Sequence, residues 1–252
     1  MKAQRLAPWL LLAALVVLWQ VGVVAFNVPD FIFPGPWQIA QEFGAYTGPL
    51  MRAAWGTFWV TMVGFGLAIA VGVLLGFLIG SSRTAYSAVY PLMVGFNAVP
   101  KAAIVPILVV WFGIGIGPGI LTAFLISFFP IMVNVATGLA TLEPELEDVL
   151  RVLGARRWDV LVKVGLPRSM PYFYGSLKVA ITLAFVGTVL AEMTAGDSGI
   201  GNLIQTAGSQ QRMPLAFAGL VLISAMAMAM YEVFSALEKH TTAWAHRGSQ
   251  NP

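Results

Sequence analysis

The sequence predicts an all-α integral membrane protein with about six transmembrane helices and a cytoplasmic two-helix coupling loop, and three observations support this fold class. Hydrophobic residues make up 58% of the 252 residues and charged residues only 10%, whereas soluble domains have about 45–50% apolar and about 25% charged residues. Apolar segments recur along the chain, each near the roughly 20 residues with which a helix crosses a bilayer. Basic residues concentrate in alternate connections between these segments.

The whole chain, residues 1–252, is expected to form a single transmembrane domain. The first apolar segment follows Lys2 and Arg5 and therefore resembles a signal peptide. It lacks a clear small-residue cleavage site before Asn27, so we interpret it as an uncleaved first span. No internal repeat divides the chain into two halves. The expected spans lie at residues 8–26, 53–79, 84–112, 118–139, 172–193 and 215–237.

The distribution of charge predicts how these spans are oriented. By the positive-inside rule, the side that holds most of the basic residues is cytoplasmic, which places both termini in the cytoplasm. The same rule accounts for the net charge of +3, and no basic run supports a nucleic-acid partner. The basic residues on that side are Lys2, Arg5, Arg83, those at 151–168, Lys239 and Arg247. The opposite side holds Arg52 and Arg212 together with Asp30, Glu42 and Asp197.

Small residues and prolines mark special positions in the second and third spans. Small residues at four-residue spacing, from Gly64 to Gly80, share one helical face, along which another helix can approach closely. Static packing and a moving interface are both compatible with this pattern. In the third span, Pro91, Pro100 and Pro106 predict a broken helix, which is tolerated at membrane depth only against protein or a water-filled cavity.

The one long loop on the basic side, at residues 143–168, is predicted to form two short amphipathic helices. Val149, Leu150 and Leu153 share one apolar face, and Gly154 is expected to end this first helix. A second apolar face continues along Trp158, Leu161 and Val164, and Pro167 is expected to end the second helix. Both faces must pack either on the protein's own spans or on a partner, and the periodicity leaves the two alternatives open.

Residues 148–167 resemble the EAA loop of binding-protein-dependent ABC importer permeases. Asp148 occupies the glutamate position of that pattern, Val149 and Leu150 replace its two alanines, and Leu153, Gly154 and Ala155 match it. The pattern closes at Leu166 and Pro167. Three further segments, at residues 100–115, 128–134 and 191–201, are similar to permeases of the nitrate, sulfonate and taurine importers.

The resemblance implies a homodimeric permease of a bacterial inner membrane. It would bind two ATP-binding-cassette subunits through its loops and receive solute from an external binding protein. The chain contains no phosphate-binding loop of the nucleotide-hydrolysing type. It is therefore expected to bind no cofactor and to lack enzymatic activity, with ATP and magnesium held by the partner ATPase. The residues expected to couple to that ATPase are Asp148, Val149, Leu150, Leu153, Gly154, Ala155, Trp158, Leu161, Leu166 and Pro167.

The implied cargo is a small organic or inorganic anion, such as a sulfonate, nitrate, taurine or a carboxylate. An ABC permease for an uncharged vitamin or pyrimidine precursor is the alternative. A secondary transporter is the main rival from another class, although such proteins usually carry internal repeats and intramembrane charges. A membrane enzyme is disfavoured because the chain has no cysteine, and its two histidines lie near the C-terminus.

Three polar residues are candidates for the transport pathway. Glu192 lies near the outer end of the fifth span, where an ionisable group is a functional candidate, although a carboxylate bonded to the following glycine-rich loop is equally compatible. Lys101 follows a predicted helix break and either attracts an anion or extends to the interface. Asn134 lies four residues after Pro130, where it contacts substrate or satisfies backbone groups freed by the proline.

Overall fold

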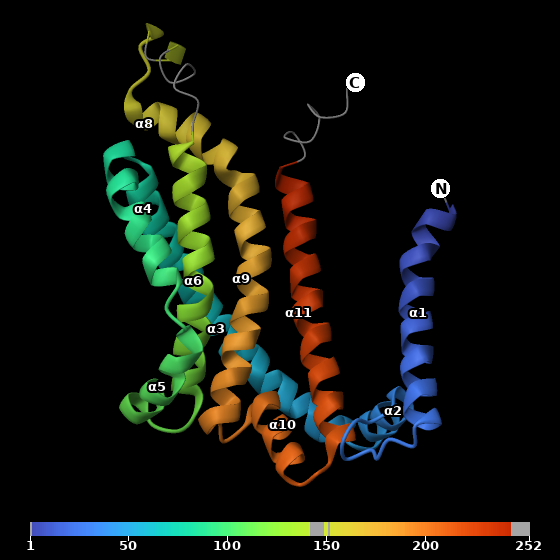
Figure 1. Cartoon of the computed structure of the whole chain (residues 1–252). Coiled ribbons are helices and arrows are strands. Elements are labelled where there is room, and N and C mark those ends of the chain that lie inside the picture. Colours follow the sequence, from blue (N-terminus) through green and yellow to red (C-terminus); the bar gives the residue numbers. More distant parts are fainter. Residues whose placement is uncertain (1, 142–148, 151, 243–252) are drawn as a thin grey trace.

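The protein is a bundle of long helices in a computed structural model that describes residues 2–141, 149–150 and 152–242. In Figure 1, α6, α9 and α11 stand side by side, and α3 passes obliquely behind them. The helices in chain order are α1 (Lys2–Ala25), α2 (Pro36–Ala45), α3 (Thr47–Gly80), α4 (Arg83–Asn97), the 3-10 helix η1 (Lys101–Ile104), α5 (Val105–Phe112), α6 (Ile116–Ala140), α8 (Arg157–Val160), the π-helical η2 (Leu161–Gly165), α9 (Leu166–Ala195), α10 (Gly199–Ser209) and α11 (Met213–Thr241).

Five segments in the described part of the chain are long and apolar enough to cross a membrane, and a bent pair makes a sixth. The bent pair is α4 followed by η1 and α5, which meet at 70°. The break falls at residues 98–100, directly before η1, as the prolines predict. The prediction of an all-α membrane protein with about six spans is confirmed.

The two ends of the bundle differ in what they carry. The first turn of α1, the last turn of α11 and the short helix α8 lie at one end, which is the upper end in Figure 1. The short helices α2 and α10 lie at the other end. The charge distribution in the sequence likewise predicts that both termini and the long loop lie on one side of the membrane. We call the first the α8 end and the second the α10 end.

The small-residue face of α3 packs directly on α6. A Cβ atom at Gly76 would lie 2.7 Å from the carbonyl oxygen of Met132 and 2.8 Å from the Cβ of Val135. At Gly80 it would lie 2.6 Å from the carbonyl oxygen of Ala136. Real Cβ atoms do not approach so closely, so these positions require glycine. The two backbones therefore touch along a seam, as expected from small residues in a membrane helix pair.

We expect Gly76→Val to destabilise the protein by about 1–3 kcal/mol, the usual cost of forcing methyl groups into a packed interior. Gly66→Val is a matched control, because it makes the same change in the same helix at an exposed position where a Cβ meets no atom within 4 Å. Thermal unfolding in detergent measures both. Equal melting temperatures for the two variants would show that α3 and α6 separate readily at the seam.

Two ion pairs tie α11 to its neighbours. Lys178 of α9 lies 2.7 Å from Glu238, and both side chains are mostly buried. This pair joins α9 to α11 across 60 residues of the chain. At the α10 end, Arg212 pairs with Glu42 of α2 at 3.1 Å and lies over the ring of Tyr46.

Candidate functional site

The bend at Gly154 in the predicted coupling loop has a defined geometry. Gly154 has a φ of +86°, a conformation that residues with side chains rarely adopt. The amide of Ala155 donates to the carbonyl oxygen of Leu150 at 3.0 Å, which is the longer bond of the Schellman motif at a helix C-terminus. The prediction that Gly154 ends the first helix is confirmed. Asp148 lies outside the described residues.

The second helix of the loop does not end where the sequence analysis placed its end. Pro167 lies at the start of α9, directly after the π-helical turn η2, and the helix continues through it. The segments α8, η2 and α9 follow one another without a gap, so one candidate span runs from Trp158 to Ala195. The expected end at Pro167 is therefore wrong, and the second helix of the loop continues directly into the fifth span.

The apolar faces of the loop are covered unequally. Leu161 packs against the core of the bundle. The Trp158 ring packs against the Phe77 ring of α3, with 6.1 Å between the ring centroids. Val152 and Leu153, in contrast, are 88% and 77% exposed. Among the described residues of the loop, packing on the protein's own spans thus covers part of the second face, while Val149, Val152 and Leu153 stay exposed. Leu166 and Pro167 are half-buried at the start of α9.

A small cavity of about 300 Å³ lies at the bend of the loop. Eight residues from the two sides of the bend line it: Leu150, Leu153, Gly154, Ala155, Asp159, Val160, Lys163 and Val164. The structure therefore brings four of the predicted coupling residues together around one hollow. Val149 and Trp158 are exposed outside it. Their role in coupling stays a prediction.

Glu192 is buried at the α10 end, where its carboxylate joins three helices. Thr57 of α3 is fully buried, and its hydroxyl oxygen lies 2.9 Å from both carboxylate oxygens of Glu192. The amide of Gly201 donates to the same carboxylate at 2.9 Å, and the amide of Ile200 donates to the Thr57 hydroxyl at 2.8 Å. We call Thr57 and Glu192, with these two amides, the latch.

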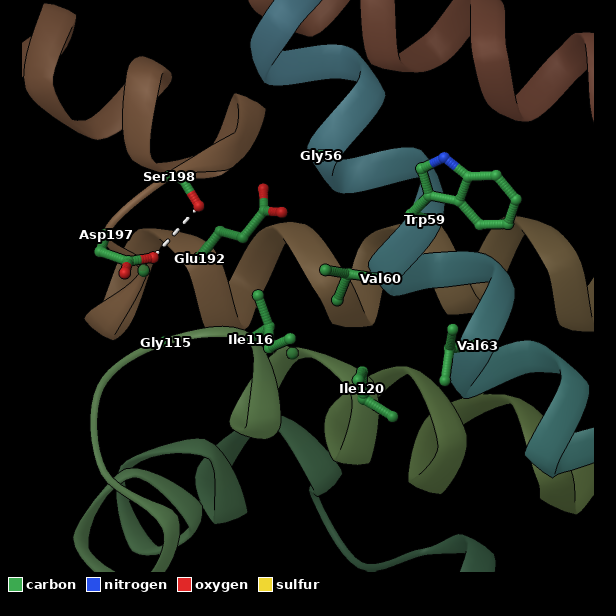
Figure 2. Close-up of a pocket in the computed structure, with 12 residues that line it drawn as sticks. Gly56, Trp59, Val60, Val63, Gly115, Ile116, Ile120, Glu192, Asp197 and Ser198 are labelled. Carbon is green, nitrogen blue, oxygen red and sulfur yellow. Dashed lines mark hydrogen bonds between the residues drawn. The ribbon is translucent and has the colours of Figure 1, made fainter.

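The latch replaces a local helix cap on α10. Ser198 occupies the N-cap position but makes no capping bond, and its hydroxyl donates to Asp197 instead (Figure 2). The first amides of α10 therefore depend on side chains from α3 and α9. Gly199 has a φ of +94°, and the Glu192 carboxyl group occupies the space that a Cβ would need. Of the two interpretations of Glu192, the structure has the carboxylate bonded to the glycine-rich loop.

Thr57 is the functional candidate that the sequence analysis missed. It lies in an apolar span among other small and hydroxyl residues, and nothing in the local pattern separates it from a threonine that bonds to its own helix. Thr61, one turn further, forms a second contact with α9 by donating to the Thr188 hydroxyl at 2.8 Å. A pair of buried threonines at four-residue spacing is the one signal that could have identified this contact.

Lys101 and Asn134, the other pathway candidates, both have partners within the bundle. The Lys101 amine donates to the Asn97 side chain at 2.8 Å and lies over the ring of Phe129, so it is held at the break between α4 and α5. The Asn134 amide donates to the carbonyl oxygen of Pro130 at 2.8 Å. This acceptor is the carbonyl of Pro130 itself. The carbonyl that loses its donor because proline has no N–H is the one four residues earlier. An anion-attracting role for Lys101 stays a prediction.

Comparison with known proteins identifies the family. The family model for the "Binding-protein-dependent transport system inner membrane component" matches residues 68–242. A riboflavin transport system permease from Chloroflexus aurantiacus is 31% identical over 235 residues, which cover 92% of this chain and 88% of that protein. A taurine transport system permease from Escherichia coli is 28% identical over 240 residues, covering 91% and 86%.

The fold has a solved counterpart. An inward-facing structure of the MetNI methionine ABC transporter matches with a TM-score of 0.66 and 18% identity, covering 79% of this chain and 98% of the matched chain. This likeness shows the fold, and the family match shows the class of protein. A secondary transporter and a membrane enzyme are thereby set aside. The chain belongs to the inner membrane components of binding-protein-dependent transport systems and is an ABC transporter permease.

Proposed function

We propose that two copies of this chain form the translocation pathway of an ATP-driven importer for a small solute. ATP binding and hydrolysis belong to two separate ATPase subunits, which hold ATP and magnesium and bind the loop at residues 143–168. An external solute-binding protein delivers the cargo. The observation that carries this proposal is the uncovered apolar face of Val152 and Leu153 beside the bend at Gly154. Exposed apolar surface of this kind marks an interaction site.

The connection from this loop to the opposite end of the bundle supports a mechanical role. Because α8, η2 and α9 are contiguous, a displacement of the loop moves α9 as a unit. A helix of 30 residues is about 45 Å long, so α9 spans the bundle. At its far end it carries Glu192 and the latch. Closure of the ATPases would thus reach α10 through one rigid element.

The proposed orientation places the α8 end in the cytoplasm and the α10 end outside. Arg83, Arg156, Lys163 and Arg168 lie at or near the α8 end, which therefore holds the basic excess that marks the cytoplasmic side. The α10 end has Arg212 paired with Glu42, together with Arg52, Asp30 and Asp197. Both termini of the chain would then be cytoplasmic, and the cargo would enter beside α10.

For the cargo, we propose a small anion, of the sulfonate, nitrate, taurine or carboxylate type. The relative named for taurine transport supports this class. The relative named for riboflavin transport favours the second candidate, an uncharged vitamin or pyrimidine precursor. Competition for uptake between a sulfonate and riboflavin in cells expressing the importer separates the two classes.

Native mass measurement of the purified complex tests the assembly. We expect two copies of this chain with two ATPase subunits, because six spans without an internal repeat cannot close a pathway alone. Leu153→Glu should abolish co-purification of the ATPase, since it places a charge on the apolar face, and should leave the dimer intact. Ser209→Glu adds the same charge at the opposite end and serves as the control. A monomer that retains transport contradicts the proposal.

A further inference from the structure

Two adjoining cavities open beside α3 at the α10 end of the bundle. The first, of about 270 Å³, lies between α3, the start of α6 and the end of α9, and Figure 2 shows Val60, Val63 and Ile120 around it. The second, of about 500 Å³, lies between α3 and α10. Gly56 and Ser198 line both, so the two cavities adjoin at these residues, and we call the pair the hollow and each cavity a compartment.

The two compartments differ in chemistry. The first is walled mainly by aliphatic side chains of α3 and α6, and the polar residues Glu192, Asp197 and Ser198 line it on the side of α9 and α10. The second is lined by Arg52 and by the polar side chains of Asn202, Thr206 and Gln210 on α10, and no acidic residue lines it. Arg52 is exposed and forms no ion pair with any residue that the structure describes. The hollow therefore has one cationic, polar part and one apolar part.

The compartments follow each other along the direction in which α3 crosses the membrane. Arg52, Gly56, Val60 and Val63 share one face of this helix, at the three- and four-residue spacing of α-helical neighbours. At 1.5 Å per residue, Val63 lies about 16 Å deeper along the helix than Arg52. The cation lies near the start of the spanning helix, at the depth of a lipid phosphate, and the apolar groove lies deeper, at the depth of the acyl chain. The two compartments therefore match the two parts of a phospholipid.

Two tryptophans indicate that this region of α3 lies at the boundary between headgroups and hydrocarbon. Trp55 and Trp59 are 62% and 52% exposed, and Trp59 also lines the apolar compartment. Tryptophan is enriched at this boundary, where its ring is partly apolar and its N–H can reach polar groups. The apolar groove beside Trp59 therefore adjoins lipid, which fits an acyl chain better than a water-soluble solute.

We propose that the hollow is a phospholipid-binding site, in which the lipid phosphate pairs with Arg52 beside the polar face of α10 and one acyl chain lies between α3 and α6. Gly56 is the passage between the two compartments. A Cβ at Gly56 meets no atom within 4 Å, so the passage is open, and a long side chain there would fill it. Glu192 of the latch lines the apolar compartment, so the bound lipid contacts the element that holds α10.

Native mass spectrometry of the purified complex, with phosphatidylethanolamine as the probe, tests the site. Arg52→Gln should weaken lipid binding by about tenfold or more, the amount that a charge-assisted hydrogen bond contributes. Arg52→Lys should weaken it less, because the charge remains. Gly56→Leu should abolish binding at this site by filling the passage. Gly66→Leu is the matched control, because Gly66 is exposed in the same helix and lines neither compartment.

Two lipid fragments separate the sources of the phosphate. Diacylglycerol has the chains without the phosphate, and glycerophosphoethanolamine has the phosphate without the chains, so each should bind far more weakly than the whole lipid. Binding of glycerophosphoethanolamine as tight as that of the lipid would assign the hollow to a soluble anion and overturn the proposal. Unchanged lipid binding by both Arg52→Gln and Gly56→Leu would also overturn it.

The absence of cysteine from the natural sequence allows a further check against burial by a second copy. A single Val63→Cys substitution places a thiol in the apolar compartment. If the groove holds lipid, this thiol should not cross-link to a second copy of the chain. Efficient cross-linking there would assign the groove to the dimer interface and contradict the lipid site.

Discussion

Gly154→Val should abolish uptake while leaving membrane insertion unchanged. Gly154 has a φ of +86° and lies outside the candidate membrane spans. A β-branched residue in this conformation costs about 1–3 kcal/mol of backbone strain, so the bend that orients Val152 and Leu153 would relax. A Cβ at this position meets no atom within 4 Å, so the strain arises from the backbone and not from a clash within the chain. Uptake, ATPase stimulation and co-purification of the ATPase measure the effect.

Two control variants separate the bend from the bulk of the new side chain. Asparagine tolerates positive φ better than other residues with side chains, so Gly154→Asn should retain much of the uptake if the bend is what matters. Asp148→Asn should have a milder effect, because the sequence predicts only a helix-dipole contribution from this carboxylate, worth about 0.3–1 kcal/mol. Full uptake by Gly154→Val with the ATPase still bound would reduce the loop to a linker.

Thr57→Val should destabilise the protein by about 2 kcal/mol or more and loosen α10. Valine has nearly the shape of threonine, so packing is preserved and only the hydroxyl is lost. The amide of Ile200 then has no acceptor, and the Glu192 carboxylate loses a donor. Each buried polar group left unpaired costs about 1–3 kcal/mol. Thermal unfolding in detergent gives the loss of stability, and protease cleavage between α9 and α10 reports on the loosening.

Thr57→Ser is the matched variant, because it keeps the hydroxyl and removes only a methyl group. It should unfold close to the temperature of the unmodified protein and resist the protease equally. If Thr57→Val is as stable as Thr57→Ser, the hydroxyl is dispensable and the latch does not hold α10. The comparison is independent of the ATPase and of the cargo, since neither is present in the measurement.

The helix end and the helix break that were predicted from local sequence agree with the structure. Glycine at 154 predicted a helix end, and prolines predicted the break before η1, because both effects arise from backbone geometry within one turn. Pro167 was misjudged for a related reason. A proline often ends a helix, but here the π-helical turn η2 precedes Pro167 and the helix continues through it, and the local sequence does not reveal such a turn.

By itself, the sequence determined that the chain crosses a membrane about six times and bends at Gly154, because hydrophobic length, proline and glycine act through the local chain and the surrounding solvent. Only the tertiary structure decided which distant groups meet. Thr57 and Glu192 are 135 residues apart, and Lys178 and Glu238 are 60 apart. Their pairing depends on how α3, α9 and α11 pack, and close helix packing depends on backbone contacts such as the α3–α6 seam. The local sequence around a carboxylate, lysine or threonine is the same whether or not its side chain has a partner in the folded protein. Its partner is therefore set by packing alone.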